Sequence, residues 1–129
     1  MPHFIIIGSL LAMLSVAFGA MGAHSLKNSL DLQTLSVFQT AATYQMYHAL
    51  ALILTALSYP HCLNSKLLNT AGWLFLAGIL LFSGSLYGLS IWGIKSLGMI
   101  TPIGGMCFIV AWLLFALSFM VKTNELLAE

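Results

Sequence analysis

The stretch that decides the fold is Val37 to Tyr59, VFQTAATYQMYHALALILTALSY, which is long enough to cross a bilayer as a helix. At 100° per residue, most of its hydrogen-bonding side chains fall in one sector about 100° wide. That sector contains Thr40, Tyr44, Tyr47, His48, Ala51, Thr55 and Ser58. The opposite sector contains Ala42, Met46, Ala49, Leu50, Ile53 and Leu57. The pattern predicts a membrane helix that turns Tyr44 and His48 toward neighbouring helices and its apolar side toward lipid.

The composition favours an integral membrane protein. Of the 129 residues, 60% are hydrophobic and 5% are charged, and the mean hydropathy is +1.02. A soluble fold could not cover so apolar a surface with polar groups. A net charge of +1 without any arginine or basic cluster argues against nucleic acid as a partner. The charged residues leave intervals long enough for membrane helices, and they are Lys27, Asp31, Lys66, Lys95, Lys122, Glu125 and Glu129.

The length and the hydrophobic pattern predict an all-α fold, a four-transmembrane-helix bundle that forms a single integral membrane domain over residues 1–129. The expected spans cover about residues 4–24, 36–59, 69–92 and 101–121. Asp31 is the expected N-cap of a helix that begins at Leu32, so the second helix should start with a short interfacial extension. Thr101 and Pro102 are the expected N-cap and first residue of the last helix, which should run to about Val121.

The first apolar run also resembles the core of a signal peptide, because Ala20 and Gly22 are small enough for a cleavage site. No Lys or Arg precedes it, however, and it is long for such a segment, so we expect a retained span. Four spans would place both termini on one side of a cell (inner) membrane in a multi-pass protein. The lysines nearly balance between the two sides, and the N-terminal amine favours termini inside.

Small residues form stripes on several of the expected helices. Such stripes let helix backbones approach closely in lipid, and GxxxG is the best-known pattern of this kind. Gly84 and Gly88 have this spacing in the third span. We therefore expect helix packing through Gly8, Ser15, Gly19, Ala23, Gly84, Gly88 and Gly104.

Depth in the membrane predicts one polar pocket. If the helices alternate in direction, the end of the first span, the start of the second, the end of the third and the start of the fourth lie toward the same leaflet. Tyr44 and Tyr87 should then lie at similar depth, with His48 near Ser83. The expected pocket is lined by Thr40, Tyr44, His48, Ser83, Tyr87 and Thr101. Two interpretations stay open: simple cross-helix hydrogen bonds, and a His48 that handles a proton or binds a ligand.

The sequence offers little support for a metal, a cofactor or catalysis. His24 and His48 should differ in depth by roughly 15 Å at 1.5 Å per residue, so they cannot share a metal within one chain. Ser83 or Ser85 with His48 lacks a carboxylate within the spans to orient the imidazole. Cys62 and Cys107 are expected as free thiols. We therefore expect no cofactor and no enzymatic activity.

Four segments, taken together and in order, resemble a known family. They are GAMGAH (19–24); Thr40 with YQMYHALA (44–51); FSGSLY (82–87); and TPIGG (101–105) with Phe108 and Trp112 behind it. They resemble the bacterial membrane family called domain of unknown function 423, which is related to human transmembrane protein 256. Met21 stands where an aromatic residue is expected, and Thr43 where a charged residue is expected. The resemblance covers essentially the whole chain and implies an integral membrane protein without an established activity.

The function expected from these observations is that of a non-enzymatic accessory or scaffold protein that acts through helix packing. Its expected partners are the lipid bilayer and either copies of itself, as a homo-oligomer, or a larger membrane protein. The alternative is a channel, a transporter or a lipid or small-solute binder that uses the polar pocket around His48 and Tyr87. A redox or quinone-binding subunit is a third possibility.

Overall fold

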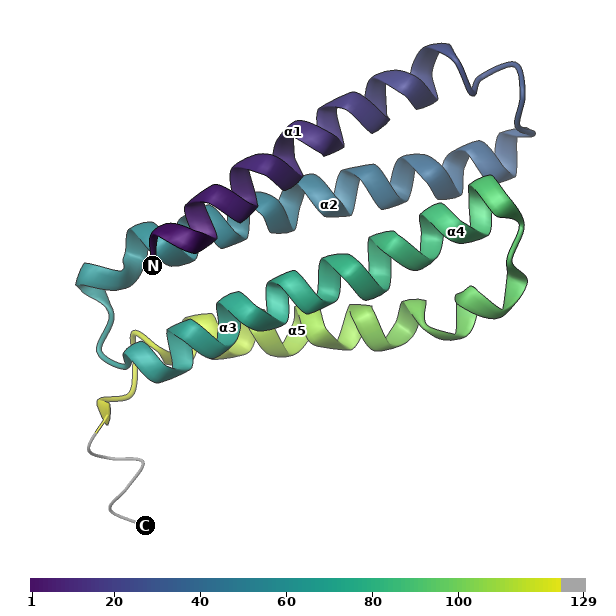
Figure 1. Ribbon diagram of the computed structural model, residues 1–129. Coiled ribbons are helices and arrows are strands. Elements are labelled where there is room, and N and C mark those ends of the chain that lie inside the picture. The colour runs from purple at the N-terminus through teal and green to yellow at the C-terminus, as the bar shows by residue number, and fades with distance from the viewer. Residues whose placement is uncertain (124–129) are drawn as a thin grey trace.

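The computed structural model describes residues 1–123, which form a bundle of long helices without strands (Figure 1). Glu125 and Glu129, two of the charged residues that bound the expected spans, are outside the described residues. The principal helices are α1 (Pro2–His24), α2 (Leu32–Ser58), α3 (Ser65–Gly78), α4 (Gly84–Trp92) and α5 (Thr101–Leu117). The shorter elements are the 3₁₀ turns η1 (Tyr59–His61) and η3 (Lys95–Met99) and the π-helical turn η2 (Ile79–Ser83).

The helices alternate in direction. In Figure 1, α1 and α2 form one antiparallel pair, and α3, η2 and α4 form a continuous rod that runs antiparallel to α5. The α1–α2 and α4–α5 connections lie at one end of the bundle, while Met1, η1 and the end of α5 lie at the other. α2 contacts α1, α3, η2 and α4, so it is the helix that joins the two pairs. This arrangement brings the end of α1, the start of α2, the end of α4 and the start of α5 to the same end of the bundle, as expected.

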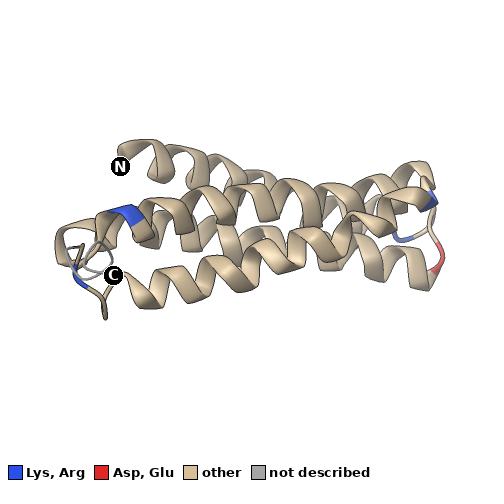
Figure 2. Ribbon diagram, turned by 90° about the horizontal axis from the view of Figure 1, so that it is seen from below, with Lys and Arg blue, Asp and Glu red and all other residues tan. Residues whose placement is uncertain are grey.

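Three helical segments are long and apolar enough to cross a membrane: Pro2–His24, Ser65–Trp92 and Lys95–Leu117. α2 is not among them, because its stretch from 39 to 48 contains glutamine, threonine, tyrosine and histidine side chains. The charged residues of the described part lie toward the two ends of the bundle, and the ribbon between them carries none (Figure 2). This is the charge distribution of a bundle whose middle lies in hydrocarbon.

The core lies between α2, α3 and α5, with the start of α1 against it. Phe4, Leu52 and Phe75 are fully buried there, and Phe108 is nearly so. Large apolar side chains also cover the outside: Val16 is 62% exposed and Ile109 is 63% exposed. Apolar residues therefore occupy both the inside and the outside, as expected where the surrounding solvent is lipid.

The predicted start of α2, with Asp31 as its N-cap, is confirmed. Asp31 is the N-cap of α2, and its carboxylate accepts hydrogen bonds from the Thr34 N–H at 2.8 Å and from the Thr34 hydroxyl at 3.1 Å. These two donors favour the charged form and hold the pKa of Asp31 below its ordinary value. α2 therefore starts where a local side-chain acceptor satisfies its free N–H groups.

The boundaries of the last helix differ from the prediction. Ile100, and not Thr101, is the N-cap of α5, because the Thr101 hydroxyl bonds to Ser85 and to the Leu97 carbonyl instead. α5 ends at Leu117 rather than near Val121. The carbonyl of Ser118 accepts hydrogen bonds from the N–H groups of Leu63 and Asn64, at 2.9 Å and 3.0 Å. The chain after α5 is thus tied to the α2–α3 connection and cannot continue the helical ladder.

The turn η2 interrupts the third predicted span, and no sequence pattern indicated it. At this level α5 comes very close to the rod, because a Cβ atom added to Gly104 would overlap the backbone nitrogen of Phe82. Gly104 therefore lies where α5 packs closely against η2 of the same chain.

Candidate functional site

Polar residues lie on both the buried side and the outer side of α2, whereas the sequence predicted a single polar side facing the other helices. Ala42 and Ala49, expected to face lipid, are buried, whereas Tyr44 is 40% exposed and Tyr47 is 58% exposed. Small residues explain the difference, because they let α1 approach α2 closely. The Ser15 hydroxyl donates to the Ala42 carbonyl at 2.6 Å. α2 is therefore rotated relative to the prediction, with its small residues inside.

A hydrogen-bonded chain joins three helices in the interior. The Tyr87 hydroxyl on α4 donates to the Gln45 side-chain oxygen on α2 at 2.6 Å. The Gln45 amide then donates to the Leu11 carbonyl on α1 at 2.8 Å. Gln45 is 3% exposed, and the sequence analysis missed it. The sequence feature that could have identified Gln45 is its amide group within an apolar helix, because an amide in lipid requires hydrogen-bond partners.

His48 is 5% exposed, and both of its ring nitrogens have partners. Nδ1 lies 2.8 Å from the Tyr44 carbonyl, and because a carbonyl only accepts, Nδ1 carries the hydrogen. Nε2 accepts a hydrogen bond from the Trp112 indole N–H at 3.2 Å. The ring also stacks on Phe108, with centroids 3.5 Å apart. These contacts select one neutral tautomer of His48 and leave neither nitrogen free.

The other predicted pocket residues bond elsewhere. Ser83 donates to the Ala41 carbonyl at 2.8 Å and not to His48. Thr40 donates to the Ser36 carbonyl of its own helix at 2.9 Å. The hydroxyls of Ser85 and Thr101 bond to each other. The structure therefore does not bring the six predicted residues into one pocket, because most of their hydrogen-bonding groups are satisfied by the nearest backbone carbonyl.

Of the six, Tyr44 and His48 line a common cavity. It has a volume of about 540 Å³, opens on the outside of the bundle and lies between α2, η2 and α5. The tyrosine hydroxyls of Tyr44 and Tyr47 have no hydrogen-bond partner among residues 1–123. The cavity is lined by Tyr44, Tyr47, His48, Phe82, Gly105, Phe108, Ile109 and Trp112.

The predicted packing residues fall into two groups. Gly8, Ser15, Gly88 and Gly104 are buried and face another part of the same chain. The others lie toward the outside: Ala23 is exposed, and Cβ atoms added to Gly19 or Gly84 would meet nothing within 4 Å. The second group is therefore open to a partner outside the chain.

A groove of about 260 Å³ lies between α1 and α2 on this outer surface. Its lining includes Gly19, Thr43 and Tyr47, which bring small and hydroxyl-bearing residues together. Within residues 1–123 no group of three or more His, Cys, Asp or Glu side chains could hold a metal ion. Cys62 and Cys107 are both free. The arrangement is suited to hydrogen bonding and packing.

The comparisons with known proteins confirm the family resemblance. A family model described as protein of unknown function (DUF423) matches residues 18–105. A UPF0382 membrane protein of Staphylococcus aureus is 50% identical over 119 residues, which cover 92% of this chain and 95% of the relative. The UPF0382 membrane protein YwdK of Bacillus subtilis is 45% identical over 118 residues, which cover 92% and 96%. No solved structure matches the chain.

Proposed function

This chain belongs to the DUF423 family of membrane proteins of unknown function, and we propose that it is a non-enzymatic accessory protein that associates with copies of itself. In this proposal it crosses a bacterial inner membrane four times, because α2 is a span in addition to the three segments that are long and apolar enough. α2 has 27 residues and would be about 40 Å long, which exceeds a hydrocarbon core of about 30 Å. Its first turn, next to the charged Asp31, then forms the interfacial extension.

The polar residues of α2 are compatible with a span because most of them have partners inside the bundle. Gln45 and His48 are bonded to other helices, and Thr55 donates to the Ala51 carbonyl at 2.8 Å. A bonded polar group costs far less in hydrocarbon than a free one. The central position of α2 thus explains its low hydropathy, and the hydrogen bonds of its polar residues make it compatible with a fourth span.

The observation that carries the proposed association is the outward position of Tyr44 and Tyr47. Both lie near the middle of α2, and Tyr47 is about 22 Å along the helix from Leu32 at 1.5 Å per residue. Lipid tails offer no acceptor to the two hydroxyls at this depth, so leaving them in hydrocarbon is costly. A protein surface that supplies hydrogen-bond partners would remove this cost.

A second copy of the chain is the partner that this surface fits. The hydroxyls of Thr43 and Tyr47 both donate and accept, so the same surface can bond to itself across a two-fold axis. The groove beside them contains Gly19, where nothing lies within 4 Å of an added Cβ. An open glycine beside hydroxyl groups is typical of helix contacts in lipid.

The test is the size of the purified protein in a mild detergent, measured by light scattering after gel filtration. We expect the wild type to be an oligomer and Gly19→Leu and Gly84→Leu to shift it toward the monomer. Ala17→Leu is the control, because Ala17 is exposed and lies about 200° around α1 from Gly19 at 100° per residue. A monomeric wild type, or an unchanged oligomer in both glycine variants, would contradict the proposal.

The alternative, a binder or transporter built around His48, has weaker support because both ring nitrogens already have protein partners. We expect His48→Ala to destabilise the fold by about 2 kcal/mol, since it leaves a cavity beside Phe108 and frees the Trp112 N–H. Trp112→Phe, which removes one hydrogen bond and little volume, should cost only about 0.6 kcal/mol. Unfolding measured in mixed detergent micelles checks both values. If His48→Ala instead kept full stability, a role of His48 in binding would gain support.

A further inference from the structure

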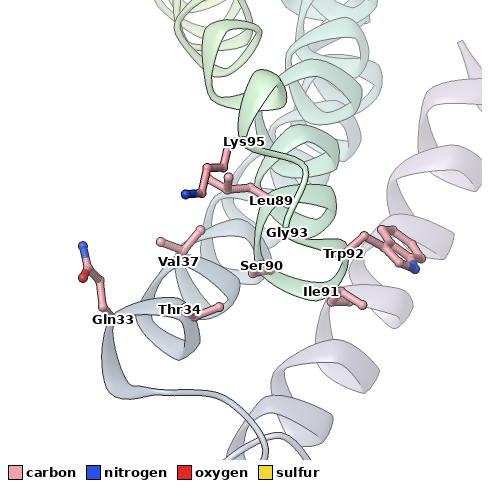
Figure 3. A pocket seen from close by; sticks show the side chains of 9 residues that line it. All are labelled: Gln33, Thr34, Val37, Leu89, Ser90, Ile91, Trp92, Gly93 and Lys95. Carbon is pink, nitrogen blue, oxygen red and sulfur yellow. The ribbon is translucent and has the colours of Figure 1, made fainter.

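A separate cavity lies at one end of the bundle, between the start of α2 and the end of α4 (Figure 3). Its volume is about 640 Å³. α2 contributes Gln33, Thr34 and Val37, α4 contributes its last turn, and the connection to α5 contributes Gly93 and Lys95.

The lining of this cavity changes from apolar to polar along the helix axis. Val37 lies one turn deeper in the bundle than Thr34, and Leu89 lies one turn deeper than Gly93. The outer part contains Lys95, which is the only charged residue among the described residues that line the cavity. An amphiphile that is oriented in a leaflet has the same order, with its headgroup outside and its chains inside.

The cavity also lies where a membrane surface is expected. The segment Ser65–Trp92, which is apolar enough to cross a membrane, ends at its edge, and the segment Lys95–Leu117 begins there. The Trp92 ring is 72% exposed at this boundary. Tryptophan at the end of a span is typical of the headgroup region.

Among residues 1–123, three side chains of the lining carry N–H donors without a hydrogen-bond partner in the structure, namely Gln33, Trp92 and Lys95. The Thr34 hydroxyl donates to Asp31 and the Ser90 hydroxyl donates to the Leu86 carbonyl, so both are already used. Within residues 1–123, no carboxylate is part of the lining. In Figure 3 the Lys95 amino group and the Gln33 amide both extend away from the helices on the same side as Val37. An ammonium and an amide are suitable donors for an anionic oxygen.

We propose that this cavity binds the phosphate diester of a membrane phospholipid through Lys95 and Gln33. The glycerol and the first acyl carbons pack against Val37 and Leu89. The apolar inner half identifies a lipid as the source of the phosphate, because a free phosphate ion would leave that half unfilled. A basic residue in a cavity between membrane helices is a recurring arrangement for headgroup binding. This inference does not depend on whether the chain associates with itself.

The test is binding of a phosphatidylglycerol to the full-length protein in detergent, followed by native mass spectrometry. We expect one lipid to bind per chain with the highest affinity, and Lys95→Met to weaken that binding about tenfold, as expected for loss of one charge-assisted hydrogen bond. Lys95→Arg should restore it, because it keeps the charge and the donors. Lys27→Met is the matched control, since it removes a lysine at the same end of the bundle that does not line the cavity.

Three results would overturn the inference. Equal binding by Lys95→Met and the wild type would show that Lys95 does not hold the headgroup. An equal loss in Lys27→Met would show unspecific attraction to a positive surface. Displacement of the lipid by inorganic phosphate at similar concentration would show a site for soluble anions. Circular dichroism and the unfolding midpoint of each variant confirm that a loss of binding does not come from a loss of fold.

Discussion

The inner and outer sides of α2 both carry hydrogen-bonding side chains, but those side chains differ in burial and in whether they have partners. Gln45 is 3% exposed and has two hydrogen-bonded partners on other helices, whereas Tyr47 is 58% exposed and has none among residues 1–123. The two residues are only two positions apart in the sequence. The difference indicates that one chain supplies hydrogen-bond partners for the polar side chains inside the bundle but not for those on the outer side of α2. Substitutions inside should therefore change folding, and substitutions outside should change association.

The largest expected effect is at the closest approach of two helices. Gly104→Ala should destabilise the fold by about 1–3 kcal/mol, because the added methyl group would overlap the backbone of Phe82. Gly105→Ala is the neighbouring control, since its Cβ would lie 3.8 Å from the Phe82 ring in ordinary contact. That control should be neutral or slightly stabilising, because alanine favours a helix more than glycine does. Unfolding in mixed micelles measures both, and equal stabilities would contradict the packing described here.

The interior hydrogen-bonded chain offers the next test. Gln45→Leu should cost about 1–2 kcal/mol, because it leaves the Tyr87 hydroxyl and the Leu11 carbonyl without their partner. Tyr87→Phe removes only the hydroxyl and should cost less. A double-mutant cycle of the two changes should give a coupling free energy of about 0.6 kcal/mol, the average for hydrogen bonds in membrane proteins. A coupling of zero would mean that this bond does not stabilise the bundle.

A change on the outer side should leave the single chain intact. Tyr47→Phe removes a hydroxyl that has no partner among residues 1–123, so the free energy of unfolding of the monomer should change by less than about 0.5 kcal/mol. The same change should weaken self-association, which can be followed by energy transfer between labelled copies in vesicles. Tyr59→Phe is a control, because Tyr59 is also exposed, at 47%, but lies at the end of the bundle. If both variants behaved alike, depth in the membrane would not distinguish the two hydroxyls.

The smallest expected effect concerns the N-cap of α2. Because Thr34 lowers the pKa of Asp31, its carboxylate stabilises the fold at pH values above the ordinary carboxyl pKa. This contribution is lost as the pH falls through the lowered pKa. Asp31→Asn keeps an acceptor for the Thr34 N–H but does not titrate, so its stability should depend less on pH in the acidic range. Unfolding midpoints of both proteins at neutral and acidic pH measure the difference, in which the titration of other carboxylates cancels.

Local features of the sequence predicted much of the fold. Long apolar runs indicated helices, the positions of the charged residues indicated the ends of the bundle, and Asp31 marked the start of α2. Each of these features depends only on one segment of the sequence and on whether lipid or water surrounds it. The alternating directions of the helices then followed from the short connections.

The candidate site was predicted less well. His48 was correctly placed in the interior, but its partner is Trp112 and not Ser83, and the partner of Tyr87 is the unpredicted Gln45. The Tyr44 ring packs against Phe82, with centroids 4.9 Å apart, but the side chain stays 40% exposed, and Tyr47 of the same predicted sector is 58% exposed. Predicting which side chains bond to each other requires the rotation of each helix about its own axis. The polar sector of α2 alone did not determine that rotation.

By itself, the sequence determined that this is a membrane protein of the DUF423 family made of long apolar helices with charged ends. Only the tertiary structure decided which side of α2 is buried, where α5 ends and how η2 meets Gly104. The physical reason is that lipid and protein interior are equally apolar, so hydrophobicity does not distinguish them. Small residues such as Ala42 and Ala49 pack inside because neighbouring helices can approach them closely, and that depends on the shape of the whole bundle.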